Sequence, residues 1–228
     1  MSDDPNPHRR RWPRWYWLVL SLVGLLLGTS AITAALVLGP LGKIVGVAYR
    51  GYYIPSEAMM PTLLRNDRII AHMSSPVELR RGMIILIDVG GRDYIKRLAA
   101  LPGDRVGFVG GDFYLNGRLV PRRALGQFPT EGTDLPGPAR RFSESFPGET
   151  RSHEILDTGL SIGDDYASRT VPAGHVFVLG DNRDHSADSR FSLEEMGVEM
   201  LPISRIRGVA RFIYWRQGDG FGNWALSD

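Results

Sequence analysis

The sequence predicts a mostly β fold of antiparallel sheets, with a loop-rich insertion and one preceding transmembrane helix. Three features lead to this prediction: a long uncharged apolar run near the N-terminus, many short apolar runs bounded by Gly and Pro after Arg50, and a polar stretch of weak periodicity from Pro121 to Thr170. With 228 residues, the chain can hold one membrane anchor and one domain of roughly 180 residues.

The apolar run from Trp17 to Leu38 contains 22 residues and no Asp, Glu, Lys or Arg. A helix needs about 20 such residues to cross a bilayer core, so we expect a transmembrane helix at residues 17–38. More basic residues precede this run than follow it, which predicts a cytoplasmic N-terminus at 1–16, a linker at 39–50 and an exported domain at 51–228. A cleavable signal peptide with small residues at 33–35 is the alternative, but its apolar region is usually only about 7 to 15 residues long.

The composition excludes several classes of function. A net charge of +2 without a basic block argues against nucleic acid as a partner. The absence of cysteine excludes disulfides, thiol catalysis and cysteine-based metal sites. The five histidines are widely separated and none forms a His-x-x-x-His pair, so we expect neither a metal site nor a cofactor.

The exported part contains a series of short apolar runs with Gly or Pro at their ends. This pattern is typical of a β-rich domain. We expect strands at Arg68–His72, Met83–Asp88, Tyr94–Leu98, Val106–Val109, His175–Leu179 and Ile206–Trp215.

Local signals predict three further elements. Asn116-Gly117 lies between two short apolar segments within Phe113–Val120, and both residues tolerate positive φ, so we expect a β-hairpin there. Ser192–Met200 is the best short helical candidate outside the membrane. Residues 121–170 are expected to be rich in loops with some β structure, within a non-catalytic insertion or cap at 105–170.

Lys96 is the only lysine of the exported domain. Of the chain's 27 basic residues, two are lysine, Lys43 and Lys96, and the other 25 are arginine. Arginine stays protonated at any reachable pH, whereas a lysine buried among apolar neighbours can lose its proton and act as a general base. In this strand-like segment, Tyr94, Lys96 and Leu98 share one face, and burial on that face would lower the pKa of Lys96. The alternative is a lysine that snorkels at a sheet edge.

The segment Gly180–Arg190 follows an expected strand and concentrates charge. Its acidic residues and arginines interleave in a way that suits a closed ion-pair network, which could hold Ser186 against the amine of Lys96. A solvated surface turn is the alternative for the same composition. The charged residues are Asp181, Arg183, Asp184, Asp188 and Arg190.

Four segments behind the predicted anchor resemble bacterial signal peptidase I, the serine/lysine dyad family that cleaves signal peptides from exported precursors. The resemblance covers most of the exported domain and implies a signal-peptidase-like β fold. It also implies a place in the bacterial inner membrane, with the catalytic domain on the periplasmic or extracytoplasmic side. The implied partners are the signal peptides of secreted precursors and the lipid bilayer. The four segments are Ile54–Leu63, Tyr94–Arg97, Leu101–Asp104 and Gly180–Arg190.

The resemblance implies roles for individual residues. Lys96 would be the general base and Ser186 would orient it, while the hydroxyl of Ser56 and the backbone N–H of Ala58 would form the oxyanion hole. The charged residues of Gly180–Arg190 would support the loop that carries Ser186. The positions that match the shallow pockets for small P1 and P3 side chains are Tyr52, Ile54, Pro55, Met59, Leu63, Ile69, Tyr94 and Ile95.

The sequence departs from this family at Ala58, where the family has its nucleophilic serine. Three interpretations follow: a Ser→Ala replacement introduced into a competent peptidase, a natural pseudoprotease that still binds signal peptides, and an active enzyme that uses Ser56. On an extended segment, Ser56 would lie about 6.5 to 7 Å from the position of residue 58. A nucleophile must lie within about 3 Å of its base, so we expect impaired catalysis with retained substrate binding.

Three other functions are alternatives. Gly159–Gly163 matches the Gly-x-Ser-x-Gly motif of α/β-hydrolases. That motif requires a helix directly after it, but no apolar helical period follows here. A peptidase of conjugative transfer that processes one dedicated pilin-like substrate is the second alternative. A membrane-anchored module that binds exported hydrophobic segments is the third.

Overall fold

The computed structural model describes residues 18–19, 49–73, 78–135, 137–149 and 151–226. The transmembrane helix predicted at residues 17–38 lies outside these ranges, except for two residues with helical backbone. Within the described ranges, no helix has the length and apolarity needed to cross a membrane. The chain divides into two compact units, at 1–47 and 48–228, and the following paragraphs concern the second unit.

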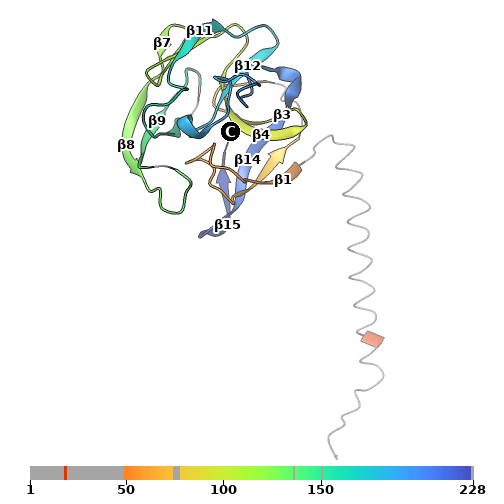
Figure 1. The fold of residues 1–228 in the computed structure, drawn as a ribbon. Coiled ribbons are helices and arrows are strands. Elements are labelled where there is room, and N and C mark those ends of the chain that lie inside the picture. The colour runs from red at the N-terminus through yellow and green to blue at the C-terminus, as the bar shows by residue number, and fades with distance from the viewer. Residues whose placement is uncertain (1–17, 20–48, 74–77, 136, 150, 227–228) are drawn as a thin grey trace, which may run out of the picture. The chain divides into compact units, whose positions relative to one another are not determined.

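The largest sheet of this unit contains eight antiparallel strands and carries most of the site described below. Its order is β1-β2-β14-β3-β4-β12-β13, with β15 beside β14 (Figure 1). The strands are β1 (Tyr49–Tyr53), β2 (Arg68–His72), β3 (Ile84–Val89), β4 (Arg92–Ala100), β12 (His175–Leu179), β13 (Leu201–Pro202), β14 (Ile206–Arg216) and β15 (Gly220–Ala225).

Two smaller antiparallel sheets complete the unit, and Figure 1 shows β8 and β9 on the flank opposite β1. The four-stranded sheet has the order β11-β5-β6-β7, and the three-stranded sheet, called the insertion sheet below, has the order β10-β9-β8. The strands are β5 (Arg105–Val109), β6 (Asp112–Leu115), β7 (Arg118–Leu119), β8 (Arg122–Phe128), β9 (Ala139–Glu144), β10 (His153–Asp157) and β11 (Tyr166–Thr170), and the 3₁₀ turns are η1 (Arg183–His185) and η2 (Ile203–Arg205).

The centre of the large sheet is buried on both faces, which explains why its strands are apolar without alternation. In β3, residues Ile84 to Ile87 are all fully buried. Ile84 and Leu86 pack into one hydrophobic cluster, whereas Ile85 and Ile87 pack into another on the opposite face. The antiparallel register of β3 with β4 places Ile85 opposite Lys96, so the amine-bearing residue belongs to the best-buried part of the fold.

The mostly antiparallel β fold is confirmed, and the six predicted strands are present with small changes at their ends. The predicted hairpin is also confirmed. Asn116 and Gly117 have φ values of 55° and 76° and connect β6 to β7, as a turn with two positive-φ residues requires.

The short helix predicted from local pattern is wrong, and the stretch predicted to be rich in loops contains more β structure than expected. Ser192–Met200 forms turns instead of a helix, and positive φ at Met196 and Glu199 is incompatible with helical backbone. The stretch from 121 to 170 contains four strands, three of which form the insertion sheet, so it is more regular than expected. Its strands escaped prediction because β8 is largely exposed and carries no alternating apolar pattern.

Candidate active site

Lys96 is buried in the middle of β4, where its side chain meets the loop that follows β12. The residue is 2% exposed, and its Nζ lies 2.8 Å from Ser186 Oγ. Burial lowers the pKa of Lys96 to about 8; Asp188 and Asp181 oppose this shift and Arg190 adds to it. A substantial fraction of this amine is therefore neutral near pH 8, as a general base requires.

Ser186 reaches Lys96 because a tight turn brings the loop back under the end of β12. The residue follows η1 and has extended backbone, with φ of −131° and ψ of 120°. Gly180, the first residue after β12, makes this approach possible. A Cβ built on Gly180 would lie 2.1 Å from Ser186 Oγ and 2.6 Å from the carbonyl oxygen of Ala58, so no side chain fits there.

A buried ion pair fixes the far end of this loop. Asp188 Oδ1 lies 2.9 Å from Arg190 Nε, and the other carboxylate oxygen accepts the N–H of Gly180 at 3.0 Å. Burial acts to raise the pKa of Asp188, but the guanidinium of Arg190 lowers it below the ordinary value of an aspartate. Arg190 also donates to the carbonyl oxygen of Gly163, which ties the loop to the segment before β11.

A second buried ion pair involves Arg97, the residue that follows Lys96 on β4. Arg97 donates from Nε and Nη2 to the two carboxylate oxygens of Asp181, at 2.7 and 2.6 Å. Thr62 donates its hydroxyl to the same carboxylate. Burial acts to lower the pKa of Arg97, but Asp181 raises it above the ordinary value of an arginine. The pair therefore connects β4, the loop after β12 and the segment that carries Ala58.

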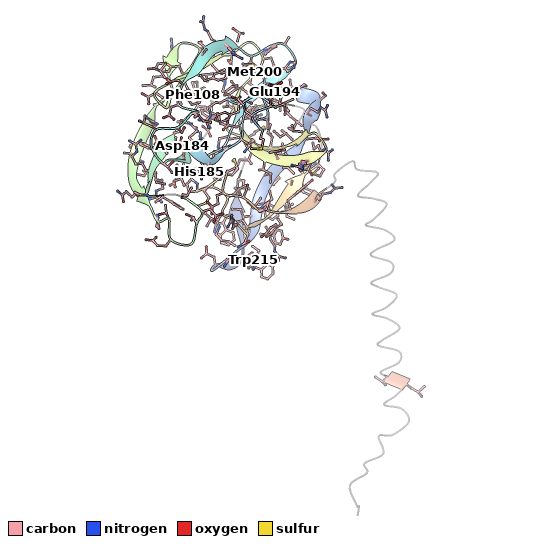
Figure 2. All side chains as sticks on the ribbon, in the orientation of Figure 1. Phe108, Asp184, His185, Glu194, Met200 and Trp215 are labelled. Carbon is pink, nitrogen blue, oxygen red and sulfur yellow. The ribbon has the colours of Figure 1, made fainter. Side chains whose placement is uncertain are left out.

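The remaining two predicted loop residues bind the insertion sheet. Arg183 makes two hydrogen bonds to the carboxylate of Glu144 at the end of β9. Asp184 accepts the backbone N–H of Thr158 at 2.6 Å and its hydroxyl at 3.1 Å. Figure 2 labels Asp184 near the middle of the unit, well away from Trp215 at the end of β14. All five charged residues of the loop thus have specific partners, which contradicts the alternative of a solvated surface turn.

Ala58 lies beside the same loop, at the point where β1 has ended. The backbone N–H of Asn182 donates to the carbonyl oxygen of Ala58 at 3.2 Å, and its side-chain amide donates to the carbonyl oxygen of Glu57 at 3.1 Å. Ser56 is exposed. The backbone bends at Ser56 and turns from Ala58 onward, so the extended geometry behind the expected spacing of these two residues is wrong.

The predicted pocket residues separate into two groups. Six of the eight pack into one hydrophobic cluster close to the segment of Ala58. Tyr94 packs against the cluster on the opposite face of the sheet, and Pro55 is exposed. The structure therefore separates Tyr94 from Ile95 and the other clustered residues, because neighbouring strand positions face opposite sides of the sheet. The six clustered residues are Tyr52, Ile54, Met59, Leu63, Ile69 and Ile95.

Sequence reasoning missed Thr62, Glu144 and Asn182 as parts of this arrangement. Thr62 and Asn182 lie inside the segments that carried the family resemblance, so position alone could have marked them. Glu144 has no such signal, because its partner Arg183 is 39 residues away in the sequence. The hydrolase-like motif is excluded in its structural context: Ser161 donates to Asp164 within a turn, and a strand follows instead of a helix.

Comparison with known proteins gives consistent relatives. The family described as "Signal peptidase, peptidase S26" matches residues 26–215. Signal peptidase I of Bacillus licheniformis is 30% identical over 82% of this chain and 86% of that protein. Signal peptidase I of Bacillus caldolyticus is 29% identical over 94% of this chain and 95% of that protein. A crystal structure of a signal peptidase I from Enterococcus faecalis V583 is 23% identical, with a TM-score of 0.34, over 58% of this chain and 96% of that one.

Proposed function

The chain belongs to the signal peptidase S26 family, and from this we propose that it is a membrane-anchored signal peptidase I whose site lacks the nucleophile. The proposed substrates are exported precursors, cleaved after small side chains at P1 and P3. The proposed location is the bacterial inner membrane, with the N-terminus in the cytoplasm. In this proposal Ala58 leaves a site that binds signal peptides and cannot cut them.

The observation that supports the proposal most is the contact between Lys96 Nζ and Ser186 Oγ at 2.8 Å. A buried amine with a lowered pKa is suited to proton transfer, and the hydrogen-bond partner of Lys96 is the hydroxyl of Ser186, while Asp188 and Asp181 act on the amine electrostatically. Ser186 would fix the direction of the amine. Residue 58 lies near Ser186, since both approach Gly180.

With a serine at position 58, the reaction would proceed in two stages, acylation of the serine and hydrolysis of the acyl-enzyme. Neutral Lys96 takes the proton of the serine hydroxyl while the serine oxygen attacks the scissile carbonyl. The hydroxyl of Ser56 and the backbone N–H of residue 58 stabilise the resulting oxyanion. The protonated amine then gives its proton to the leaving amino group. Water, activated by the same amine, releases the acyl group and restores the enzyme.

Ala58 has no hydroxyl to attack the scissile carbonyl, so the acyl-enzyme on which the later steps act does not form. Removal of a catalytic-triad member leaves only about 10³- to 10⁴-fold catalysis over water, which comes from binding and the oxyanion hole. The retained Lys96 favours an introduced Ser→Ala replacement over a natural pseudoprotease. A general base has no function without a nucleophile, so a natural pseudoprotease would have no reason to retain it. The codon for residue 58 in the source genome distinguishes these two origins.

The test compares the chain with its Ala58→Ser variant on a purified precursor that carries a signal peptide. We expect similar binding by both proteins and cleavage by the variant that is at least about 10³-fold faster than by the unaltered chain. Ala58→Gly is the matched control, because it changes the same position and adds no hydroxyl. A folded Ala58→Ser variant that cleaves no precursor would contradict the proposal.

Two alternatives are decided by the same assay. If the unaltered chain cleaves at ordinary rates and Ser56→Ala abolishes this, Ser56 is the nucleophile. If the Ala58→Ser variant cleaves one pilin-like substrate and no general secretory precursor, the protein is a dedicated transfer peptidase. A panel of unrelated precursors therefore belongs in the first experiment.

A further inference from the structure

The insertion sheet is bonded to the loop of Ser186 through fully buried charges. Arg183, the first residue of η1, is 6% exposed and donates from both terminal guanidinium nitrogens to Glu144, which is 1% exposed. Burial acts to raise the pKa of Glu144, but Arg183 and His153 lower it to about 2. The carboxylate thus stays ionised at all ordinary pH values and anchors the start of η1.

His153 continues this chain of bonds at the start of β10. Its Nε2 lies 3.1 Å from Glu144 Oε2 and its Nδ1 lies 2.9 Å from Glu149 Oε1. Because ionised carboxylates only accept hydrogen bonds, the ring satisfies both when it carries both N–H groups. The carboxylate of Glu149 also accepts the backbone N–H of Phe146, which fixes its own position.

The chain of bonds returns to the catalytic strand through a glycine. A Cβ built on Gly82 would lie 2.5 Å from Glu149 Oε1, so the carboxylate rests directly on that backbone. The carbonyl oxygen of Gly82 accepts a hydrogen bond from Arg97 at 2.7 Å, and Arg97 follows Lys96 on β4. Gly82, Arg97, Glu149 and His153 also line a cavity of about 220 Å³ beside this path.

These contacts form a closed path that leads from Ser186 through η1, the insertion sheet and Gly82 back to Lys96. We propose that Glu144 and His153 are positioning residues of the active site, which hold η1 so that the Ser186 hydroxyl stays in contact with the Lys96 amine. The region expected to be a non-catalytic insertion then takes part in the alignment of the base. The catalytic meaning of this alignment rests on the proposed function, but the alignment itself does not.

The physical reason lies in the cost of an uncompensated buried charge. Removal of the Glu144 charge leaves the guanidinium of Arg183 buried without a carboxylate, so η1 must move toward water to restore its solvation. Ser186 is the residue directly after η1 and moves with it. A displacement of about 1 Å at such a place can cost about 10²-fold in rate.

The test uses Glu144→Gln and His153→Gln in the chain as it is, labelled with ¹³C at the lysine Cε. The sequence contains only two lysines, Lys43 and Lys96, so the spectrum has two such signals and Lys43→Arg assigns them. We expect Glu144→Gln to raise the pKa of Lys96 by about one unit, because water reaches the amine when the loop shifts. His153→Gln keeps the Glu144–Arg183 pair and removes only a donor to Glu144, so we expect a smaller rise in the same direction. Glu154→Gln is the matched control: it neighbours His153 on β10, is 44% exposed and should leave the Lys96 signal unchanged.

The second measurement uses the same substitutions in the Ala58→Ser background. We expect kcat to fall about 10- to 100-fold with KM nearly unchanged, since the effect acts on proton transfer and not on substrate binding. If Glu144→Gln does not fold, His153→Gln, which keeps the Glu144–Arg183 pair, decides the question. An unchanged Lys96 titration and unchanged kcat in a folded variant, even with a lower melting temperature, would overturn the proposal. If the Ala58→Ser parent cleaves nothing, the proposed function fails while the lysine titration still decides the alignment.

Discussion

The two sides of the candidate site differ in how completely their side chains are bonded. On the base side, Lys96, Ser186, Asp188 and Arg190 are all buried, and each has a specific partner. On the nucleophile side, Ser56 is exposed and Ala58 is half-buried. The side-chain amide of Asn182 donates to the carbonyl oxygen of residue 57, and its backbone N–H donates to that of residue 58.

In the proposed function, this difference places the departure from the family on the nucleophile side. A base side that had lost its function would be free to replace buried charges with apolar residues, since such replacements are often neutral or stabilising. Here the charged residues are all present and paired. In the proposed function, the hydroxyl absent at residue 58 would therefore be a local change beside an otherwise intact arrangement.

The largest effect is expected from replacing the base itself. In the Ala58→Ser background, Lys96→Arg keeps a positive charge but cannot supply a neutral amine, because arginine stays protonated. We expect cleavage to fall by about 10³- to 10⁴-fold in a precursor-processing assay. Lys43→Arg is the control for the same exchange elsewhere. Near-normal cleavage by Lys96→Arg would remove the base side from the mechanism.

The second effect concerns the ion pair behind Ser186. Asp188→Asn leaves Arg190 buried without its carboxylate, and we expect a loss of about 3 to 5 kcal/mol in the free energy of unfolding. Urea denaturation followed by tryptophan fluorescence measures it. Asp165→Asn, at an exposed position directly before β11, serves as control. A loss below about 1 kcal/mol would mean that the base side is less tightly coupled than its contacts indicate.

The third effect is the pH dependence of cleavage by the Ala58→Ser variant. The neutral amine is the active form and its pKa is about 8, so kcat/KM should rise about tenfold per pH unit below 8 and level off above it. Rates from pH 6 to 10 on one precursor measure this. A flat profile, or one that falls with rising pH, would exclude Lys96 as the group that takes the proton.

The smallest effect is expected at the link between the two sides. Asn182→Ala removes the hydrogen bond from the side-chain amide to the carbonyl oxygen of Glu57. We expect kcat of the Ala58→Ser variant to fall about tenfold and the free energy of unfolding to fall by about 1 kcal/mol. The loss is limited because the amide oxygen of Asn182 has no hydrogen-bond partner among the described residues. Asn223→Ala, at an exposed position on β15, is the control. An unchanged kcat would show that the backbone alone sets the position of residue 58.

The sequence predicted the strands and the burial of Lys96 well because their signals are local. Apolar runs with Gly and Pro at their ends mark β2 and β12, and the solitary lysine among arginines marks Lys96. The partners Glu144 and His153 could not be predicted, because nothing in their own neighbourhood distinguishes a buried charge from a solvated one. Their burial depends on how the insertion sheet packs against a loop that follows much later in the chain.

The burial of Lys96 has a practical consequence for amine chemistry. Reagents that couple to exposed amino groups can react with the chain only at its N-terminus and at its two lysines, and Lys96 is 2% exposed. Attachment to an activated resin should therefore proceed through the N-terminal part and spare the base. A chain that binds precursors without cutting them could then serve as an immobilised reagent to capture intact signal peptides from cell extracts.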